Sequence, residues 1–330
     1  MPSIAASFLL SAIVTWLSIR YARQRNLIDH PGQRRSHTQP TPRGGGIGIA
    51  AAAAIFFALP LFRVYPGFGA AAAALVGLIL IAAVGWGDDH FSLAAIWRLL
   101  VHVVASLIFA VALLGQDGTI IVALFAFATT WSINLHNFMD GINGLLAAHA
   151  GFVLIVLAVL CATTLRGGVH GAMLLLWAIA TLAFLPFNFP RARVFMGDVG
   201  SGVLGLLIAV GVLWQMQVAE TASVSGLIAC SAFVIDATCN LLSRMLRGKR
   251  WYSAHREHLY QWLARGMSHL RVVLLYGVWN LLVVAPALLL LERSQDYDAA
   301  ILGAVYAFGV VLWLCGKRWC RYRVKSRHHA

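Results

Sequence analysis

Charged residues are scarce in this sequence, and acidic residues are the scarcest. The 330 residues include 12 Asp and Glu and 25 Lys and Arg, and 60% are hydrophobic. A soluble domain of this length cannot bury so many apolar side chains, so the composition excludes that class and predicts lipid as the surrounding solvent. Because carboxylates are so few, those at the ends of apolar runs are candidates for function.

Paired cysteines, a cleavable leader and a soluble basic module are also missing. The five cysteines form no Cys-x-x-Cys pair, and most lie in apolar runs, as small buried side chains do. No basic segment precedes the first apolar run and no small-residue cleavage site follows it, so we expect that run to be a retained span. The net charge of +13 then indicates basic loops at a lipid bilayer and no nucleic-acid partner.

Eleven apolar runs are long enough to cross a bilayer, which takes about 20 residues. They predict an all-α, polytopic integral membrane protein that forms a single transmembrane domain over residues 1–330. The runs lie at 3–20, 44–62, 68–87, 95–114, 119–136, 144–164, 171–187, 200–218, 223–242, 272–291 and 299–316.

Basic residues fall almost entirely on one side of this predicted bundle. The loops after the odd-numbered runs, together with a basic tail at 317–330, hold 22 of the 25 Lys and Arg residues. Short loops with this asymmetry orient toward the cytoplasm. We therefore predict a membrane protein with a periplasmic N-terminus and a cytoplasmic C-terminus.

Four polar segments lie on the predicted cytoplasmic side, although the charge count did not use their acidic residues. They are 88–90, 137–144, 188–201 and 255–258. We expect them to meet and build one active site on that face of the membrane.

Asp88 and Asp89 close the third apolar run. Adjacent carboxylates repel unless a cation lies between them, and the C-terminus of a helix disfavours negative charge. A solvated helix end is the alternative, but it does not account for that unfavourable placement. We predict a base together with a metal or substrate contact.

The second segment combines Asp140, Asn143 and flanking glycines at the start of the sixth run. Glycines permit a tight turn and a close backbone approach, and the free N–H groups of a helix start favour phosphate. An ordinary turn with a helix cap is the alternative. Such a turn does not call for Asn137 as well, so a binding role is favoured.

Asp198 stands between glycines at the start of the eighth run. A carboxylate there suits Mg²⁺, which binds a few carboxylates plus substrate phosphates. Phe195 offers a face on which a nucleobase can stack, and Asn188 lies where it can close the pocket. The alternative is an N-terminal helix cap.

His255 and His258 are spaced to share one face of a helix, with Arg256 between them. A third zinc ligand is not evident, so a cationic cluster that grips phosphates is favoured. A basic loop at the membrane surface is the alternative. The same two interpretations apply to residues 34–46, which include Arg43.

In order and spacing, these segments resemble the polyprenyl-phosphate N-acetylhexosamine-1-phosphate transferases of glycosyltransferase family 4. The resemblance rests on residues 40–46 and 88–89 with the three later segments, and it covers residues 34–263. Residues 254–261 look most similar to the branch that initiates O-antigen and related surface glycans. The peptidoglycan branch is richer in consecutive histidines at this loop.

The resemblance implies a magnesium-dependent enzyme that uses a UDP-N-acetylhexosamine and undecaprenyl phosphate. A lipid phosphate oxygen would attack the phosphate next to the sugar, and UMP would leave. Mg²⁺, or Mn²⁺ in its place, would bind Asp198 and Asp88. The implied catalytic residues are Asp88, Asp89 and Asp140, and the implied substrate-binding residues are Asn137, Asn143, Asn188, Phe195, His255, Arg256, His258 and Arg43.

Position 143 departs from the family pattern, in which a second Asp follows Asp-Gly-x. Asn143 keeps the shape and hydrogen bonding of that residue but lacks its charge, so a hydrogen bond to nucleotide or sugar is favoured over metal binding. A peptidoglycan-type phospho-MurNAc-pentapeptide transferase and a lipid or sugar transporter are the alternative functions. The identity of the N-acetylhexosamine and the oligomeric state, a homodimer included, stay open.

Overall fold

Helices make up most of the residues that the computed structural model describes, which are 2–31, 39–64, 68–219, 223–249, 255–293 and 295–328. Arg34 and Arg35 of the predicted phosphate-binding loop lie outside these ranges. The only pairing of strands within them joins β1 to β2 in an antiparallel pair of two residues each.

The N-terminal elements run from α1 to α8. They are α1 (Pro2–Gln24), β1 (Ile28–Asp29), β2 (Thr41–Pro42), α2 (Ile47–Val64), α3 (Phe68–Phe91), α4 (Ala95–Leu114), α5 (Thr119–Met139), α6 (Leu145–Ala162), α7 (Gly168–Asn188) and α8 (Gly197–Val218). The C-terminal elements are α9 (Ser225–Ala229), α10 (Ser231–Leu246), α11 (Leu259–Ala264), α12 (His269–Trp279), the π-helical turn η1 (Asn280–Val284), α13 (Ala285–Arg293), the 3-10 turn η2 (Gln295–Tyr297) and α14 (Asp298–His328).

Within the described ranges, nine helical stretches are long and apolar enough to cross a membrane. This confirms the predicted all-α, polytopic membrane fold, whereas the number differs from the eleven expected. In α2, described side chains extend only to Phe57, so its apolar stretch covers Ile47–Phe57 and the full predicted run stays a prediction there. The run predicted at 223–242 is divided at Cys230 into α9 and α10. Helix α10 carries buried polar side chains, including Asp236 and Asn240, and its 16 residues are fewer than the about 20 that span a bilayer.

Helix α8 lies inside the N-terminal bundle, packed against α2, α3, α5 and α6. Of its apolar window, 83% is buried, the largest share among the nine spans. Gly46 and Gly85 permit this packing, because a Cβ on either would lie within 3 Å of the α8 backbone. Small residues let membrane helices approach closely, and here they place the first turn of α8, with Asp198, among the surrounding helix ends.

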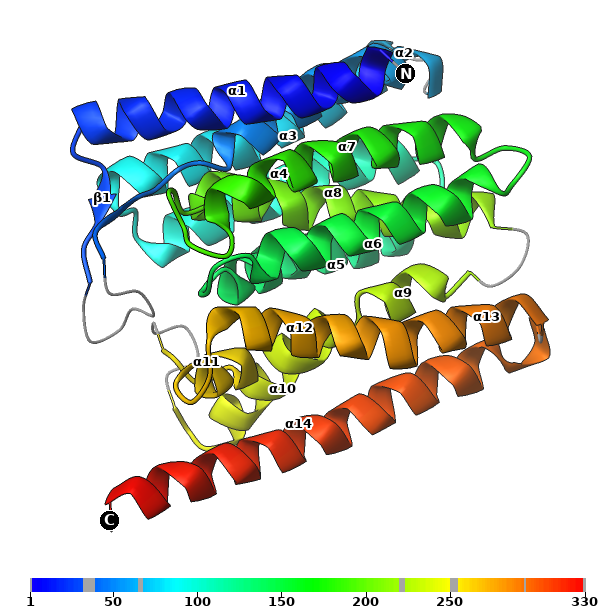
Figure 1. Ribbon diagram of the computed structural model, residues 1–330. Coiled ribbons are helices and arrows are strands. Elements are labelled where there is room, and N and C mark those ends of the chain that lie inside the picture. The colour runs from blue at the N-terminus through cyan, green and yellow to red at the C-terminus, as the bar shows by residue number, and fades with distance from the viewer. Residues whose placement is uncertain are drawn as a thin grey trace.

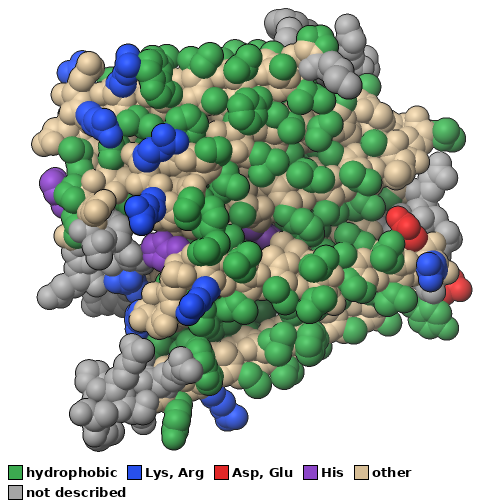
Figure 2. All heavy atoms as spheres, in the orientation of Figure 1, with side chains coloured by type: hydrophobic (Ala, Val, Ile, Leu, Met, Phe, Trp, Pro, Cys, Tyr) green, Lys and Arg blue, Asp and Glu red, His purple; other side chains and the backbone are tan. Residues whose placement is uncertain are grey.

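The C-terminal helices α12, α13 and α14 form a layer beside this bundle, and the two termini lie at opposite ends of the helices (Figure 1). Lys and Arg side chains on the visible face gather mainly toward the end that holds β1 and α11, whereas its Asp and Glu side chains lie at the other end (Figure 2). The fold therefore agrees with the charge asymmetry of the loops. The assignment of these ends to cytoplasm and periplasm stays a prediction.

Candidate active site

A cavity of about 240 Å³ opens at the basic end of the bundle. Three of the four polar segments and the loop before α2 meet around it. Seven of the predicted site residues line it: Arg43, Asp89, Asp140, Asn143, Asn188, Phe195 and Asp198. Its other lining residues are Asp29, Gly141, Ile142, Gly197, Gln261 and His269.

The Asp89 carboxylate holds the first turn of α8 in place. Its two oxygens accept hydrogen bonds from the backbone N–H groups of Asp198, at 3.1 Å, and Val199, at 3.4 Å. The first N–H groups of a helix have no acceptor within the helix. Here Asp89, a side chain from α3, is their acceptor in place of a capping residue next to α8. Asp89 is 3% exposed, and this buried contact fixes Asp198 at the cavity wall.

Asp88 and Asp198 converge on a single cationic nitrogen. Nη1 of Arg98, in the first turn of α4, donates to Asp88 Oδ2 at 2.9 Å and also to Asp198 Oδ2. The sequence pointed to Arg98 only as a flanking basic residue. The structure makes it the counter-ion of the two carboxylates that were predicted to bind the metal.

The donor chemistry of this pair fits Mg²⁺. Among the described residues, no group of three or more His, Cys, Asp and Glu side chains is arranged as a metal site. Mg²⁺ does not need one, because it commonly takes one or two carboxylates and completes its shell with water and substrate phosphates. Two carboxylates that already share one cation are such a pair, and Mg²⁺ binding stays a prediction.

Asp140 follows the last residue of α5 and faces the same cavity. Burial, together with the nearby carboxylates of Asp198 and Asp89, raises the pKa of Asp140 well above its ordinary value. Asp140 thus takes up a proton far more readily than an exposed aspartate does.

Asn188 ties together the two loops that form the cavity wall. Its Oδ1 accepts from the backbone N–H of Gly144 at 2.7 Å, and its Nδ2 donates to the carbonyl oxygen of Val194 at 2.9 Å. Asn143 adds a bond from its Nδ2 to the carbonyl oxygen of Pro190 at 3.3 Å. Asn188 therefore sets the shape of the wall as well as lining it.

The loop before α2 runs beside the segment before α8. The backbone N–H of Phe195 donates to the carbonyl of Pro42 at 2.8 Å, and that of Gly45 donates to the carbonyl of Phe195 at 2.9 Å. This pairing brings Arg43 and the Phe195 ring to one cavity. Asn137, also predicted to bind nucleotide, instead donates to Ser201 Oγ at 3.3 Å and is not among the lining residues described.

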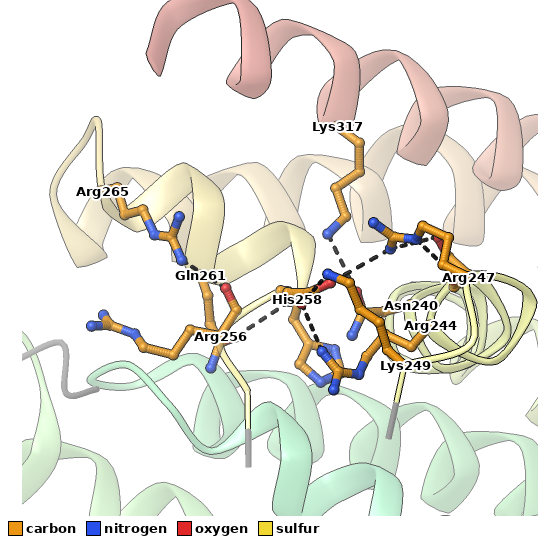
Figure 3. A network of polar contacts seen from close by, with 11 residues as sticks. Asn240, Arg244, Arg247, Lys249, Arg256, His258, Gln261, Arg265 and Lys317 are labelled. Atoms are coloured by element: carbon orange, nitrogen blue, oxygen red, sulfur yellow. Dashed lines mark hydrogen bonds and ion pairs between the residues drawn. The ribbon is translucent and has the colours of Figure 1, made fainter. Parts of the chain in front are cut away.

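The fourth polar segment lies beside the cavity rather than in its wall. Within the described chain, His255, Arg256 and His258 do not line it. Glu257 forms ion pairs with Arg244, at 2.7 Å, Lys249, at 2.9 Å, and Arg247, at 3.5 Å. Figure 3 shows these three basic side chains near His258. The contact with phosphate predicted for this segment stays a prediction.

The two histidines of this segment are packed into the protein. Their rings stack with centroids 5.1 Å apart, and His258 is 3% exposed. Burial, aided by His258 and Arg244, lowers the pKa of His255 to about 4, and burial also lowers that of His258. Both rings are therefore neutral at pH 7, which leaves Arg256 as the cation of the segment.

Gln261 and His269 reach the cavity although the sequence did not single them out. Gln261 is in α11, and His269 is the first residue of α12. The His269 Nδ1 accepts from the backbone N–H of Asn143 at 3.3 Å. Gln261 carried one signal, its place three residues after His258, whereas nothing in the sequence marks His269.

Known proteins match the part of the chain that builds this cavity. The model of glycosyl transferase family 4 covers residues 71–216, which include Asp88, Asp89, Asp140 and Asp198. A decaprenyl-phosphate N-acetylglucosaminephosphotransferase of Mycobacterium tuberculosis is 29% identical over 92% of this chain and 86% of that protein. This chain is therefore similar to the glycosyl transferases of family 4.

Other relatives of this chain carry similar names. A probable undecaprenyl-phosphate N-acetylglucosaminyl 1-phosphate transferase of Bacillus subtilis is 28% identical over 81% of this chain and 78% of its own. An undecaprenyl-phosphate alpha-N-acetylglucosaminyl 1-phosphate transferase of Yersinia pestis is 27% identical over 78% of this chain and 75% of its own. The likeness thus extends beyond residues 71–216 to most of the fold.

Asp236 connects four C-terminal helices and thereby places Gln261. Its Oδ1 accepts from the backbone N–H of Leu259 at 2.7 Å and from Trp313 Nε1 at 3.0 Å. Its Oδ2 accepts from the Tyr276 hydroxyl at 2.7 Å and from the N–H of Tyr260 at 3.2 Å. The carboxylate is 2% exposed, so these bonds compete with little water.

We expect Asp236→Asn to loosen α11. The amide replaces one acceptor oxygen by a donor, so two of the four N–H and O–H groups lose their partner, at a cost of about 2–3 kcal/mol in the free energy of unfolding. The thermal midpoint in detergent should fall by several degrees. Asp117→Asn, at an exposed carboxylate, is the matched control. Equal midpoints for the two variants would contradict the role given to Asp236.

Proposed function

We propose that this protein transfers N-acetylhexosamine 1-phosphate from a UDP-N-acetylhexosamine to a polyprenyl phosphate, with release of UMP. The convergence of Asp89, Asp140 and Asp198 with Arg43 in one cavity at the helix ends carries the proposal. Carboxylates beside a cation suit phosphates that arrive with a divalent metal. Transporters instead place their ion and substrate sites near the middle of the membrane.

The cavity offers a distinct group for each part of the donor. Arg43 provides a guanidinium for the phosphates, and the half-buried Phe195 ring provides a stacking face for the uracil. Asn143 and Gln261 provide amides that can bond to sugar or base. Asn188 is a positioning residue, because its amide already holds Gly144 and Val194.

Asp198 and Asp88 would hold Mg²⁺, with Mn²⁺ as a substitute. When bound, the metal would neutralise charge on the transferred phosphate, the main requirement of phosphoryl transfer. Arg98 now contacts both carboxylates, so metal binding would require its guanidinium to give up at least one of these contacts.

In the reaction, an oxygen of the acceptor phosphate forms a bond to the phosphorus next to the sugar, and the bond from that phosphorus to UMP breaks. Asp140 accepts a proton from a monoprotonated acceptor, because its raised pKa makes it a stronger base than an exposed aspartate. Asp89 is a positioning residue. Its carboxylate accepts two hydrogen bonds from the first turn of α8, and these bonds keep Asp198 at the cavity wall.

The finer assignments follow from the charge pattern and the resemblance. We assign the acceptor as undecaprenyl phosphate, the membrane as the bacterial inner membrane and the cavity as cytoplasmic, because the basic residues gather at the end where the cavity opens. We assign the product to the start of O-antigen or a related surface polysaccharide.

The test is UMP release by purified protein with Mg²⁺, undecaprenyl phosphate and a panel of UDP-N-acetylhexosamines. We expect release with at least one donor and none without lipid or metal. UDP-MurNAc-pentapeptide as the sole productive donor would favour the peptidoglycan-type reaction. Absence of UMP with every donor, combined with lipid movement in vesicles, would refute the transferase and support a transporter.

A further inference from the structure

A second cavity, of about 390 Å³, lies between α6 and the α12–η1 segment. It shares no lining residue with the cavity around Asp198. Apolar side chains such as Phe152, Leu274 and Leu281 form most of its wall, and the last two are 58% and 68% exposed. Both helical segments belong to candidate membrane spans, so the groove is open to lipid.

His149 brings an unsatisfied polar group into this groove. It is 3% exposed, and neither of its ring nitrogens has a hydrogen-bond partner in the described part of the chain. Its ring stacks on Phe233 with centroids 3.8 Å apart, a contact that uses the face of the imidazole and leaves its edge for polar contacts. A neutral imidazole has one N–H donor and one acceptor nitrogen.

Asn280 faces the same groove from the other helix. It is 7% exposed, and its Oδ1 lacks a donor among the residues that the structure describes. It is also the first residue of η1, where the helix widens into a π-turn, a feature frequent at functional sites. An unpaired polar atom at membrane depth is costly, and two that line one groove indicate a ligand with complementary polar atoms.

The lining narrows the chemistry of that ligand. No charged side chain of the described residues lines the groove, so nothing there would compensate a phosphate, carboxylate or ammonium group. An ester or ether can accept from the His149 N–H, but it has no hydrogen for Asn280 Oδ1. A hydroxyl both donates and accepts, and the apolar wall suits a long hydrocarbon chain.

We propose that the groove between α6 and α12 binds a long-chain lipid alcohol. The hydroxyl donates to Asn280 Oδ1 and accepts from the His149 N–H, and the chain lies along Phe152, Leu274 and Leu281. This site is separate from the cavity of the proposed reaction and does not depend on that reaction.

The test uses a photoactivatable hexadecanol and its methyl ether, in which a methyl group replaces the hydroxyl hydrogen, so that the oxygen can accept but not donate. In detergent-solubilised protein, we expect the alcohol to label peptides of α6 and α12 about tenfold more than the ether does, the ratio for roughly 1.4 kcal/mol of hydrogen bonding. Equal labelling by the two probes, or labelling confined to other helices, would overturn the proposal.

Variants assign the two polar contacts. His149→Phe keeps the stack on Phe233 and removes the nitrogens, and Asn280→Leu removes the acceptor. Asn280→Leu should reduce labelling by the alcohol about tenfold and leave labelling by the ether unchanged, because the ether has no hydrogen to donate. His149→Phe should reduce labelling by both probes about tenfold, because both accept from the His149 N–H. His102→Phe, a change at another buried histidine away from this groove, should leave both unchanged. If a variant fails to fold, the comparison of the two probes on the unaltered protein still decides.

Discussion

Asp198→Asn will lower the rate of UMP release by about a thousandfold, the upper range for loss of one preorganised electrostatic group. The side chain of Asp198 is 26% exposed and contacts the same Arg98 nitrogen as Asp88. Asparagine has nearly the same size as aspartate and keeps the backbone N–H that donates to Asp89. The loss of activity therefore measures the effect of the negative charge. UMP release should be measured over a range of Mg²⁺ concentrations, because a weakened metal site also shifts the metal requirement upward.

A matched control for this variant is Asp296→Asn, which removes one carboxylate from an exposed position in η2. It should release UMP at the unaltered rate. If Asp198→Asn releases UMP as fast as the unaltered protein does at the same Mg²⁺ concentration, Asp198 is not a metal ligand.

Gly197→Ala will reduce UMP release by about a hundredfold and lower the thermal midpoint. Gly197 has φ +77°, a conformation that costs an alanine roughly 1–2 kcal/mol. A Cβ there would also overlap the Asp89 carboxylate oxygens. That carboxylate would have to move away from the N–H groups of Asp198 and Val199, so α8 would lose its anchor and the site its geometry.

Gly118→Ala separates backbone strain from this overlap. Gly118 has φ +98°, and a Cβ there meets no atom of the described chain within 4 Å. The control should therefore lose stability through strain but keep its activity at temperatures below its midpoint. If both variants lost activity to the same extent, the contact with Asp89 would not be the cause.

The carboxylates of the site could be found from sequence because a charge is costly near lipid. Asp88, Asp89, Asp140 and Asp198 stand at the ends of apolar runs, where chance placement is disfavoured. Their convergence also followed, because alternate loops of a helical bundle emerge on the same side. The sequence thus predicted the end of the bundle that holds the cavity and most of its acidic residues.

The separate role of each of those residues could not be predicted from the sequence. Whether Asp89 points to substrate or to the first turn of α8 depends on the close packing of two helices that are far apart in sequence. Arg98 looked like one more basic residue near a loop, and nothing in the sequence marked His269. Their roles arise from side-chain directions that only the packed structure fixes.

In the segment around His255, the sequence predicted more positive charge than the folded protein carries. Its composition predicted a cluster of positive charge, since His255, Arg256 and His258 are adjacent or nearly so. Burial of the imidazoles is a property of the packed C-terminal helices, and it removes the charge of both rings. Likewise, the apolar run at 223–242 could not reveal the break at Cys230.

The four bonds to Asp236 have a consequence for the biosynthesis of the protein. Trp313, one of the four donors, follows Asp236 by 77 residues and is supplied by α14. A ribosome that has made α10, α11 and α12 has therefore not yet supplied every partner of this carboxylate. Insertion of α14 completes the set, so a chain arrested before it would hold α11 less firmly, even though every residue that lines the cavity had already been synthesised.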